Sequence, residues 1–396
     1  MTAVLEGVRV LDFGRYIAGP WCGAVLADLG AEVIRIEKVS GSEDRFLMPI
    51  TPQEDGASYM QMNRNKLGMT LNPMRDEGRE IVRKLVATAD VVVANLPPPG
   101  LKAMGLDYES LKAVKPDIIL TTVTAFGTGG PSSDRVGFDG VAQALSGAMY
   151  LSGPPGHPTK TIANFVDFGT ALSSAIGTLA ALMHRKQTGE GQHVEGSLLG
   201  TSIAFMAANL IEQSAIQVNR ISSWNRSQGS GPADTFATRD GWILVQCVGG
   251  PLFRRWCELM GEEALLDDPR FATDQARGDN GEELSERMAA WCAERTNEEA
   301  LRELDEARIP AGEVYSPQQA LDDAHIQAMG FLKNVDYPGL PEGKGAFVSD
   351  TPVRFSTIKS GVHRRAPTLG EHTDAILKEL GYSETDIAGL REQRVV

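Results

Sequence analysis

The pattern of hydrophobic and polar positions at the start of the chain predicts a strand, a helix and a second strand. Val8 to Phe13 is a short apolar run, Gly19 to Leu29 has helical spacing, and Glu32 to Glu37 alternates as a strand does. A βαβ unit of this kind begins a parallel sheet, and such sheets commonly bind nucleotide-like ligands at the carboxyl ends of their strands. Here that position corresponds to residues 14–19.

Helical and strand patterns continue to alternate along the next part of the chain. The predicted elements are a helix from Arg79 to Ala87, buried strands at Asp90 to Ala94 and Ile118 to Val123, a helix that begins at Gly137 to Asp139, and a strand around His193 to Leu198. The segment Leu96 to Gly100 is proline-rich and Thr124 to Pro131 is glycine-rich, so both are expected to be loops. The expected fold class is therefore α/β with a parallel sheet.

The stretch Ile162 to Thr170 leads into a long helix that we expect over Ala171 to Met183, where apolar residues recur at helical spacing. Asp167 lies at or just before the first turn. An aspartate there satisfies unpaired N–H groups and the positive end of the helix dipole, which contributes about 1 kcal/mol. A capping role therefore explains Asp167 without any chemistry, and Asp139 occupies a similar capping position.

The composition changes near Ser222, where a serine-, asparagine- and glycine-rich stretch through Pro232 predicts a linker. The elements expected after it are a strand at Gly241 to Val248, a helix at Leu252 to Met260, charged helices at Glu282 to Arg295 and Glu298 to Ala307, a return to loop and strand near Met329, and a helical tail from Glu371 to Leu380. We accordingly divide the chain into residues 1–221, 222–328 and 329–396.

The net charge and the cysteine content exclude some classes of binding partner and indicate a cellular compartment. The 396 residues carry a formal net charge of -14, which argues against nucleic-acid and membrane-surface partners, since both favour a positive face. No stretch is expected to approach the length that spans a bilayer, and the first residues do not resemble a signal peptide. The 4 cysteines include no CxxC pair, so we expect buried free thiols in a cytoplasmic protein.

The glycines after the first strand do not form a dinucleotide-binding motif. The segment Gly14 to Gly19 lacks the G-x-G-x-x-G spacing, so an NAD-binding role for Glu37 has little support. Lys38 is an alternative contact for a phosphate group. The segment Asn63 to Lys66 and Arg75 add positive charge near the predicted strand ends.

Several segments together resemble the class III coenzyme A transferases of the CaiB/BaiF type, the family that includes formyl-CoA:oxalate CoA-transferase and carnitine CoA-transferase. The resemblance extends over nearly the whole chain. It is carried by residues 5–13, 18–20, 26–38, 63–66, 89–90, Asn95, 139–144, Asp167 and 188–192.

The resemblance implies that Asp167 is the catalytic aspartate. Its carboxylate would attack an acyl-CoA thioester to give a mixed anhydride, and released CoA thiolate would convert the anhydride to an aspartyl-CoA thioester. An acceptor carboxylate would then attack that thioester, and the returning thiolate would complete a new acyl-CoA. A carboxylate suits this chemistry because it is ionised at neutral pH. Coenzyme A is expected only as part of the substrate, with no prosthetic group and no metal.

The resemblance also implies the CoA contacts. They fall on Ile17, Ala18, Lys38, Leu71, Asn72, Pro73, Met74, Asn95, Leu96, Pro97, Val136, Gly137, Phe138 and Asp139. Ala103 stands where many members have an arginine, and Pro99 stands where glycine is usual, so Lys102, Arg75 or Arg135 is expected to supply the missing charge. Gly249 and Gly250 correspond to a loop that closes over the substrate in the family.

Two other functions that involve coenzyme A remain open for the protein at this point. The family includes α-methylacyl-CoA racemases, which use a histidine in a Gly-His-Asp triplet, and this chain has Phe138 at that position. Phenylalanine cannot exchange a proton, which favours the transferase. The other alternative is a non-catalytic CoA-binding module. The resemblance also implies a Rossmann-like large domain built from both ends of the chain, a smaller α+β domain between them, and an interlocked homodimer.

Overall fold

The computed structural model describes residues 3–396 and divides them into two compact units. The first unit holds residues 3–146, 162–207 and 325–396, and the second holds residues 147–161 and 208–324. The units therefore divide near residues 208 and 325, whereas the predicted domain boundaries lie at 222 and 329. Residues 147–161 also belong to the second unit, although they precede the predicted linker.

A six-stranded, wholly parallel sheet forms the centre of the first unit, in the order β3-β2-β1-β4-β5-β6. Its strands are β1 (Arg9–Asp12), β2 (Glu32–Glu37), β3 (Leu67–Thr70), β4 (Val91–Ala94), β5 (Ile119–Thr124) and β6 (His193–Ser197). This is the strand order of dinucleotide-binding folds, in which the order reverses between the first and fourth strands and ligands bind there. The predicted parallel sheet is confirmed; β3 has no counterpart among the predicted strands because its sequence, Leu-Gly-Met-Thr, is not a continuous apolar run.

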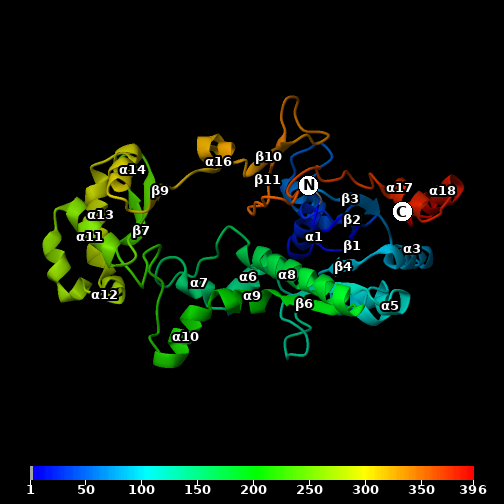
Figure 1. Cartoon of the computed structure of the whole chain (residues 1–396), viewed down its shortest axis with the longest axis horizontal. Helices are drawn as coiled ribbons and strands as arrows, with labels where there is room; N and C mark the ends of the chain where they lie inside the picture. The colour runs from blue at the N-terminus through cyan, green and yellow to red at the C-terminus, as the bar shows by residue number, and fades with distance from the viewer. Residues whose placement is uncertain (1–2) are drawn as a thin grey trace. The chain divides into compact units, whose positions relative to one another are not determined.

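Helices cover both faces of this sheet (Figure 1). One face packs against α3 (Asp76–Thr88), α5 (Tyr108–Val114), α17 (Thr373–Glu379) and α18 (Glu384–Glu392). The other face packs against α1 (Ala18–Asp28) and α8 (Phe165–Thr188). Because both faces are buried, the central strand β4 is continuously apolar from Val91 to Ala94, whereas β2 and β6 also carry charged residues.

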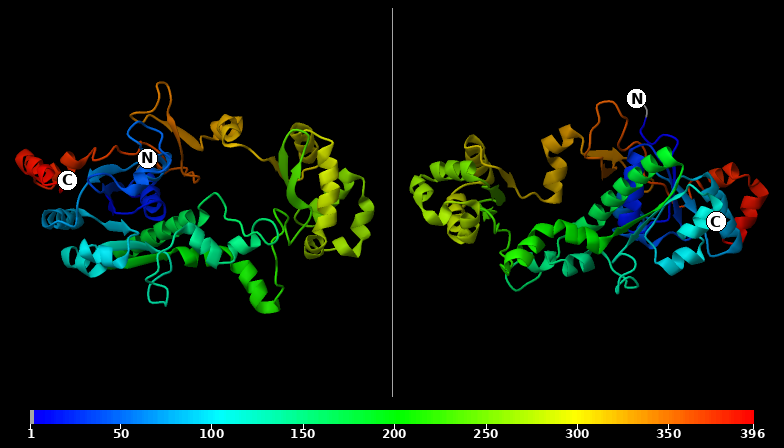
Figure 2. Two further views of the ribbon diagram at one scale, coloured as in Figure 1. Left: turned by 180° about the vertical axis from the view of Figure 1, so that it is seen from behind. Right: turned by 60° about the horizontal axis from the view of Figure 1, so that its bottom comes forward.

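The helix α8 is longer than expected and runs along β5, β6 and α1 (Figure 2). Within the described residues it is the one helix long and apolar enough to cross a membrane, so the expectation that no stretch approaches that length is wrong. Half of its most apolar window is buried inside the protein. Its small residues Ala171, Ala175 and Ala181 let it approach the sheet closely, as a core helix does.

The second unit has a three-stranded antiparallel sheet with helices packed against it. Its strands are β7 (Ala233–Ala237), β8 (Trp242–Gln246) and β9 (Ala311–Glu313), and its main helices are α11 (Gly250–Met260), α12 (Asp274–Asp279), α13 (Gly281–Ala293) and α14 (Asn297–Glu306). Trp256 lies fully buried in its core, together with the thiols of Cys247, Cys257 and Cys292. Cys22 is buried in the first unit, so all four cysteines are free and buried, as predicted.

The remaining elements are short. They are η1 (Glu43–Phe46), α2 (Ala57–Met62), α4 (Pro98–Ala103), α6 (Asp139–Leu145), α7 (Ala148–Leu151), α9 (Leu198–Phe205), α10 (Ala207–Ile216), η2 (Glu263–Asp267), η3 (Pro269–Phe271), α15 (Pro317–Asp322), α16 (Ala324–Met329), β10 (Leu332–Val335) and β11 (Ala346–Ser349). Two predictions about them are wrong. The proline-rich loop becomes helical from Pro98, because proline suits the first turn of a helix, and the C-terminal tail contains two helices instead of one.

Candidate active site

A cavity of about 1300 Å³ opens at the carboxyl ends of the parallel strands in the first unit. It is lined by Phe13 after β1, Lys38 after β2, Leu71 after β3 and Asn95 after β4. Its position at the reversal of strand order follows from the topology, because the loops after β1 and β4 leave in opposite directions there. The volume exceeds the roughly 300–1,000 Å³ of pockets for drug-sized ligands, so a ligand as long as an acyl-CoA fits its size.

Asp167 lies on the wall of this cavity, as the third residue of α8. The residue at the N-cap is Asn164, so the expected capping role of Asp167 is wrong. A carboxylate in the first turn still lies at the positive end of the helix dipole, which favours its charged form.

The capping of α8 comes from Asp139, 28 residues earlier in the chain. Its Oδ2 accepts hydrogen bonds from the N–H groups of Val166 at 2.9 Å and Asp167 at 3.1 Å. Asp139 is 3% exposed, and Gln143 donates to its other oxygen. It was expected to cap its own helix, but it is the first residue of α6 and fixes the backbone that carries Asp167.

The loop that follows β1 forms the cavity wall between the sheet and α1. Asn95 holds it from β4, since its Oδ1 accepts the Arg15 N–H at 2.6 Å and its Nδ2 donates to the Arg15 carbonyl at 2.8 Å. Gly19 must be glycine because a Cβ there would lie 2.8 Å from the Cα of Gly14. Tyr16 has a positive φ of 62° and packs edge-on against Phe138, with the ring centroids 5.5 Å apart.

Beneath this loop lies a group of paired charges that we call the buried polar layer, comprising Asp12, Arg35, Glu37, Asp44, Arg45 and Lys66. Each of these residues is at most 2% exposed. Lys66 Nζ donates to Asp12 Oδ2 and to the Pro20 carbonyl, both at 2.7 Å. Burial alone would raise the pKa of Asp12. The charges of Lys66 and Arg35 nevertheless hold this pKa below its usual value.

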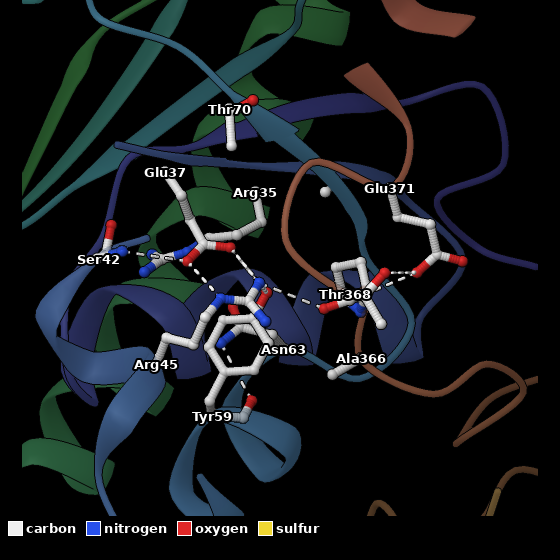
Figure 3. A network of polar contacts seen from close by, with 12 residues as sticks. Arg35, Glu37, Ser42, Arg45, Tyr59, Asn63, Thr70, Ala366, Thr368 and Glu371 are labelled. Carbon is white, nitrogen blue, oxygen red and sulfur yellow. Dashed lines mark hydrogen bonds and ion pairs between the residues drawn. The ribbon is translucent and has the colours of Figure 1, made fainter. Parts of the chain in front are cut away.

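Glu37 belongs to this layer and does not reach a ligand. Arg45 donates to it through Nε at 3.0 Å, and the Tyr59 hydroxyl donates at 2.9 Å (Figure 3). Figure 3 also shows the segment Ala366–Thr368 beside them, where the Pro367 carbonyl accepts from Arg45. Burial is the largest influence on Glu37 and opposes its charge, yet Arg45 and Arg35 lower its pKa. Glu37 is therefore a structural carboxylate, as the missing glycine motif suggested.

The structure brings most of the predicted contact residues to the same cavity as Asp167. Those on its wall are Ile17, Ala18, Lys38, Leu71, Asn72, Pro73, Met74, Asn95, Leu96, Pro97, Arg135, Val136, Gly137 and Phe138. Arg75, Lys102 and Asp139 are not among the lining residues. Arg75 precedes α3 beside Glu77, and Lys102 is an exposed residue of α4. Their predicted contact with coenzyme A remains a prediction.

Gly249 and Gly250 lie in the second unit, at the start of α11. Gly249 has a φ of 92°, and its N–H donates to Asp274 Oδ1 at 2.9 Å. This left-handed conformation explains a glycine at that position. Their predicted contact with a substrate remains a prediction.

Several lining residues were missed by the sequence reasoning, above all Arg15, Tyr16, Leu198 and Arg394. Arg15 and Tyr16 stand inside the segment that was expected to bind a ligand, so their position was a usable signal. Arg394 is more than 250 residues from the other lining cations and gives no signal in the sequence. Within residues 3–396, no cluster of three or more histidine, cysteine or acidic residues is arranged to hold a metal.

A parallel sheet in this order, with a helix-borne carboxylate in a large cavity at its reversal point, defines an α/β enzyme for a nucleotide-like ligand. The sequence model of CoA-transferase family III matches residues 5–373, and the chain belongs to that family. It is therefore a CoA-transferase, and coenzyme A enters as part of its thioester substrate. The predicted family and enzyme class are confirmed.

The relatives are similar over nearly their whole length. The chain is 33% identical to succinyl-CoA–D-citramalate CoA-transferase of Chloroflexus aurantiacus, over 99% of this chain and 98% of that protein. It is also 33% identical to succinate–glutarate CoA-transferase of Agrobacterium fabrum, over 95% of each chain. A crystal structure of a CaiB/BaiF family protein from Brucella suis matches the fold with a TM-score of 0.84 and 34% identity, covering 96% of this chain and 100% of that one.

Proposed function

We propose that the protein transfers coenzyme A from an acyl-CoA to a free carboxylic acid through a covalent intermediate on Asp167. The observation that carries the proposal is the place of Asp167, in the first turn of α8 and on the wall of the cavity that gathers the predicted CoA contacts. The helix dipole favours its carboxylate, and a carboxylate nucleophile suits acyl transfer at neutral pH. Asp139 positions it through the backbone, by accepting the N–H groups of Val166 and Asp167.

The proposed reaction has four steps. The Asp167 carboxylate attacks the thioester carbonyl and expels CoA thiolate, which leaves an acyl-aspartyl anhydride. The thiolate attacks the aspartyl carbonyl of this anhydride and releases the donor acid, which leaves an aspartyl-CoA thioester. The acceptor carboxylate attacks that thioester, and the returning thiolate attacks the acyl carbonyl of the new anhydride. The products are a new acyl-CoA and the original aspartate, so no atom or electron is left over.

Short dicarboxylic acids are the substrates we propose to test first. The relatives named above act on succinyl-CoA with D-citramalate, and on succinate and glutarate, according to their names. Succinyl-CoA would therefore be offered with each short dicarboxylic acid in turn, and new acyl-CoA would be identified by mass spectrometry. Transfer to none of several acids from several donors would contradict the proposed function.

The role of Asp167 has a direct chemical test. Incubation with the acyl-CoA donor and hydroxylamine should convert Asp167 to its hydroxamate, which peptide mass spectrometry detects. Asp167→Ala should abolish transfer while the protein still binds CoA. The matched control is Asp76→Asn, another acidic residue in the first turn of a helix, which is exposed on α3 outside the cavity. Full transfer activity of the Asp167→Ala protein would contradict the mechanism.

The two alternative functions make different predictions. A racemase needs a second proton-transfer group, but Phe138 occupies that position and is 62% exposed on the cavity wall. Exchange of the substrate α-proton with deuterated water, without any acceptor acid, would favour the racemase. Tight binding of CoA with no turnover for any pair of substrates would favour a non-catalytic module.

We further propose that the enzyme is a cytoplasmic, interlocked homodimer. Leu172, Ile176 and Met183 lie on one side of α8 and are 47%, 67% and 67% exposed. An exposed apolar stripe on a long helix fits contact with another protein surface, here a second copy of the chain. Light scattering should give twice the chain mass, whereas a monomer at micromolar concentration would contradict the dimer. The 4 free buried cysteines suit a reducing compartment.

A further inference from the structure

The phosphate groups of coenzyme A need cations, and the cavity has four among its described lining residues. These are Arg15, Lys38, Arg135 and Arg394. Three of them already have partners within the protein. Lys38 forms an ion pair with Glu43, Arg135 stacks 4.9 Å above the ring of Phe126, and Arg15 Nη1 donates to the carbonyls of Phe13, Gly14 and Ile36.

Arg394 differs from these three residues. Its side chain is exposed, and among residues 3–396 no carboxylate lies within ion-pair distance of its guanidinium. It also lies on the cavity wall next to the segment Leu71–Met74, because the N–H of Asn72 donates to the carbonyl of the following residue, Val395, at 2.7 Å. The last residues of the chain are thus fixed to a segment of the predicted CoA site.

The backbone presents Arg394 in a conformation that is unfavourable for arginine. The helix α18 ends in a Schellman motif, in which the Arg394 N–H donates to the Arg391 carbonyl at 2.9 Å and the Val395 N–H donates to the Leu390 carbonyl at 2.8 Å. Arg394 has a φ of 54°, at the position where glycine is usual. Val395 and Val396 are buried in the core, so the motif is held in place.

We propose that Arg394 binds a phosphate group of coenzyme A and compensates for the alanine at position 103, since Arg75 and Lys102 are not on the cavity wall. The argument combines the exposed guanidinium on the cavity wall with the fixed backbone that holds Arg394 there. Arg15, Lys38 and Arg135 contribute less to phosphate binding, because the charged group of each already contacts another group of the protein. The inference rests on the proposed function only in taking coenzyme A as the ligand of this cavity.

Binding of CoA measured by calorimetry tests this inference without any turnover. Arg394→Ala should weaken CoA binding roughly tenfold, since one charge-assisted hydrogen bond to phosphate is lost, and Arg394→Lys should retain part of the affinity. Arg394→Gly should weaken CoA binding equally, yet should unfold at the same or a higher temperature, because glycine suits a φ of 54°. A purely structural role of Arg394 would instead make the affinity follow the unfolding temperature.

The matched control is Arg391→Ala, which removes an exposed arginine of the same helix that pairs with Asp374 outside the cavity. It should leave CoA affinity unchanged. Competition with 3′-dephospho-CoA and with pantetheine identifies the group: loss of the Arg394→Ala effect with 3′-dephospho-CoA assigns the 3′-phosphate, and loss only with pantetheine assigns the pyrophosphate.

Equal CoA affinities of the Arg394→Ala and parent proteins would overturn the inference, as would an equal weakening of pantetheine. Failure of the proposed function has a different signature. A protein that binds CoA through Arg394 but transfers it to no acid would contradict the transferase reaction and leave the phosphate contact standing.

Discussion

The buried polar layer and the cavity next to it both contain basic residues, but these residues have different partners. In the layer, Arg35, Arg45 and Lys66 each have a carboxylate partner within 2.8 Å. On the cavity wall, Arg15 and Arg394 have none within ion-pair distance among the described residues. Cations paired inside the protein fix the shape of the ligand loop, whereas cations without such partners are free to meet an anionic substrate.

The largest effect on stability should come from breaking the layer at Lys66. Lys66→Met leaves the Asp12 carboxylate buried without its closest cation, so the free energy of unfolding should fall by about 3–5 kcal/mol. Urea denaturation measures the loss. The control Arg79→Met, which breaks the exposed pair with Asp76, should cost about 0.5 kcal/mol or less. A loss below about 1 kcal/mol for Lys66→Met would mean that the buried ion pair contributes no more to stability than an exposed ion pair does.

An intermediate effect is expected at Asp139, whose carboxylate is buried against N–H groups instead of a cation. Asp139→Ala should lower the free energy of unfolding by about 1–2 kcal/mol, as for other lost helix caps. Because Asp139 positions Asp167, Asp139→Asn should reduce kcat while the KM for acyl-CoA changes little. Steady-state kinetics separates the two parameters. A rise in KM with an unchanged kcat would argue that Asp139 acts on CoA binding instead.

The smallest effect should be at Glu371, beside the layer and partly in solvent (Figure 3). Its bidentate hydrogen bonds from Arg365 lower its pKa from 4.5 to about 2. The pair therefore stabilises the fold fully above pH 4.5, and this contribution is lost as the pH falls toward 2. Solvent screening limits it to about 1 kcal/mol or less.

Thermal unfolding at several pH values checks this expectation. Glu371→Gln should be less stable than the parent protein at pH 7, and the difference should vanish near pH 2. The exposed residue Glu392 on α18 offers a control, since Glu392→Gln should behave as the parent at both pH values. A constant difference between Glu371→Gln and parent across the range would show that the carboxylate charge is not the cause.

The elements that were predicted correctly have strong local patterns. The βαβ start, the strands β4 and β5 and the core of α8 are uninterrupted apolar or periodic runs, which burial on both faces of a parallel sheet requires. The strand β3 and the helical turn at Pro98 were missed or wrong because both contain residues typical of loops, a glycine in β3 and prolines at the start of α4, so their local sequence does not identify the element that their neighbours stabilise.

The residues of the candidate site likewise divide into those that were predicted and those that were not. Asp167 and the segments at Ile17, Asn95 and Val136 were identified through their resemblance to a family, and the structure places them around one cavity. The capping of α8 by Asp139 was not predicted, because Asp139 lies on another helix, α6. Nor could local pattern show that Lys66 is buried while Arg394 faces the cavity, since both are basic residues in polar segments.

By itself, the sequence determined a parallel α/β protein of a CoA-transferase family with Asp167 as its candidate nucleophile, because hydrophobic periodicity and ordered motifs are properties of the chain. Only the tertiary structure decided which charged groups are paired and which remain for a ligand. That difference depends on contacts between residues more than 300 positions apart, and on whether burial leaves a charge beside an opposite charge or at the wall of a cavity.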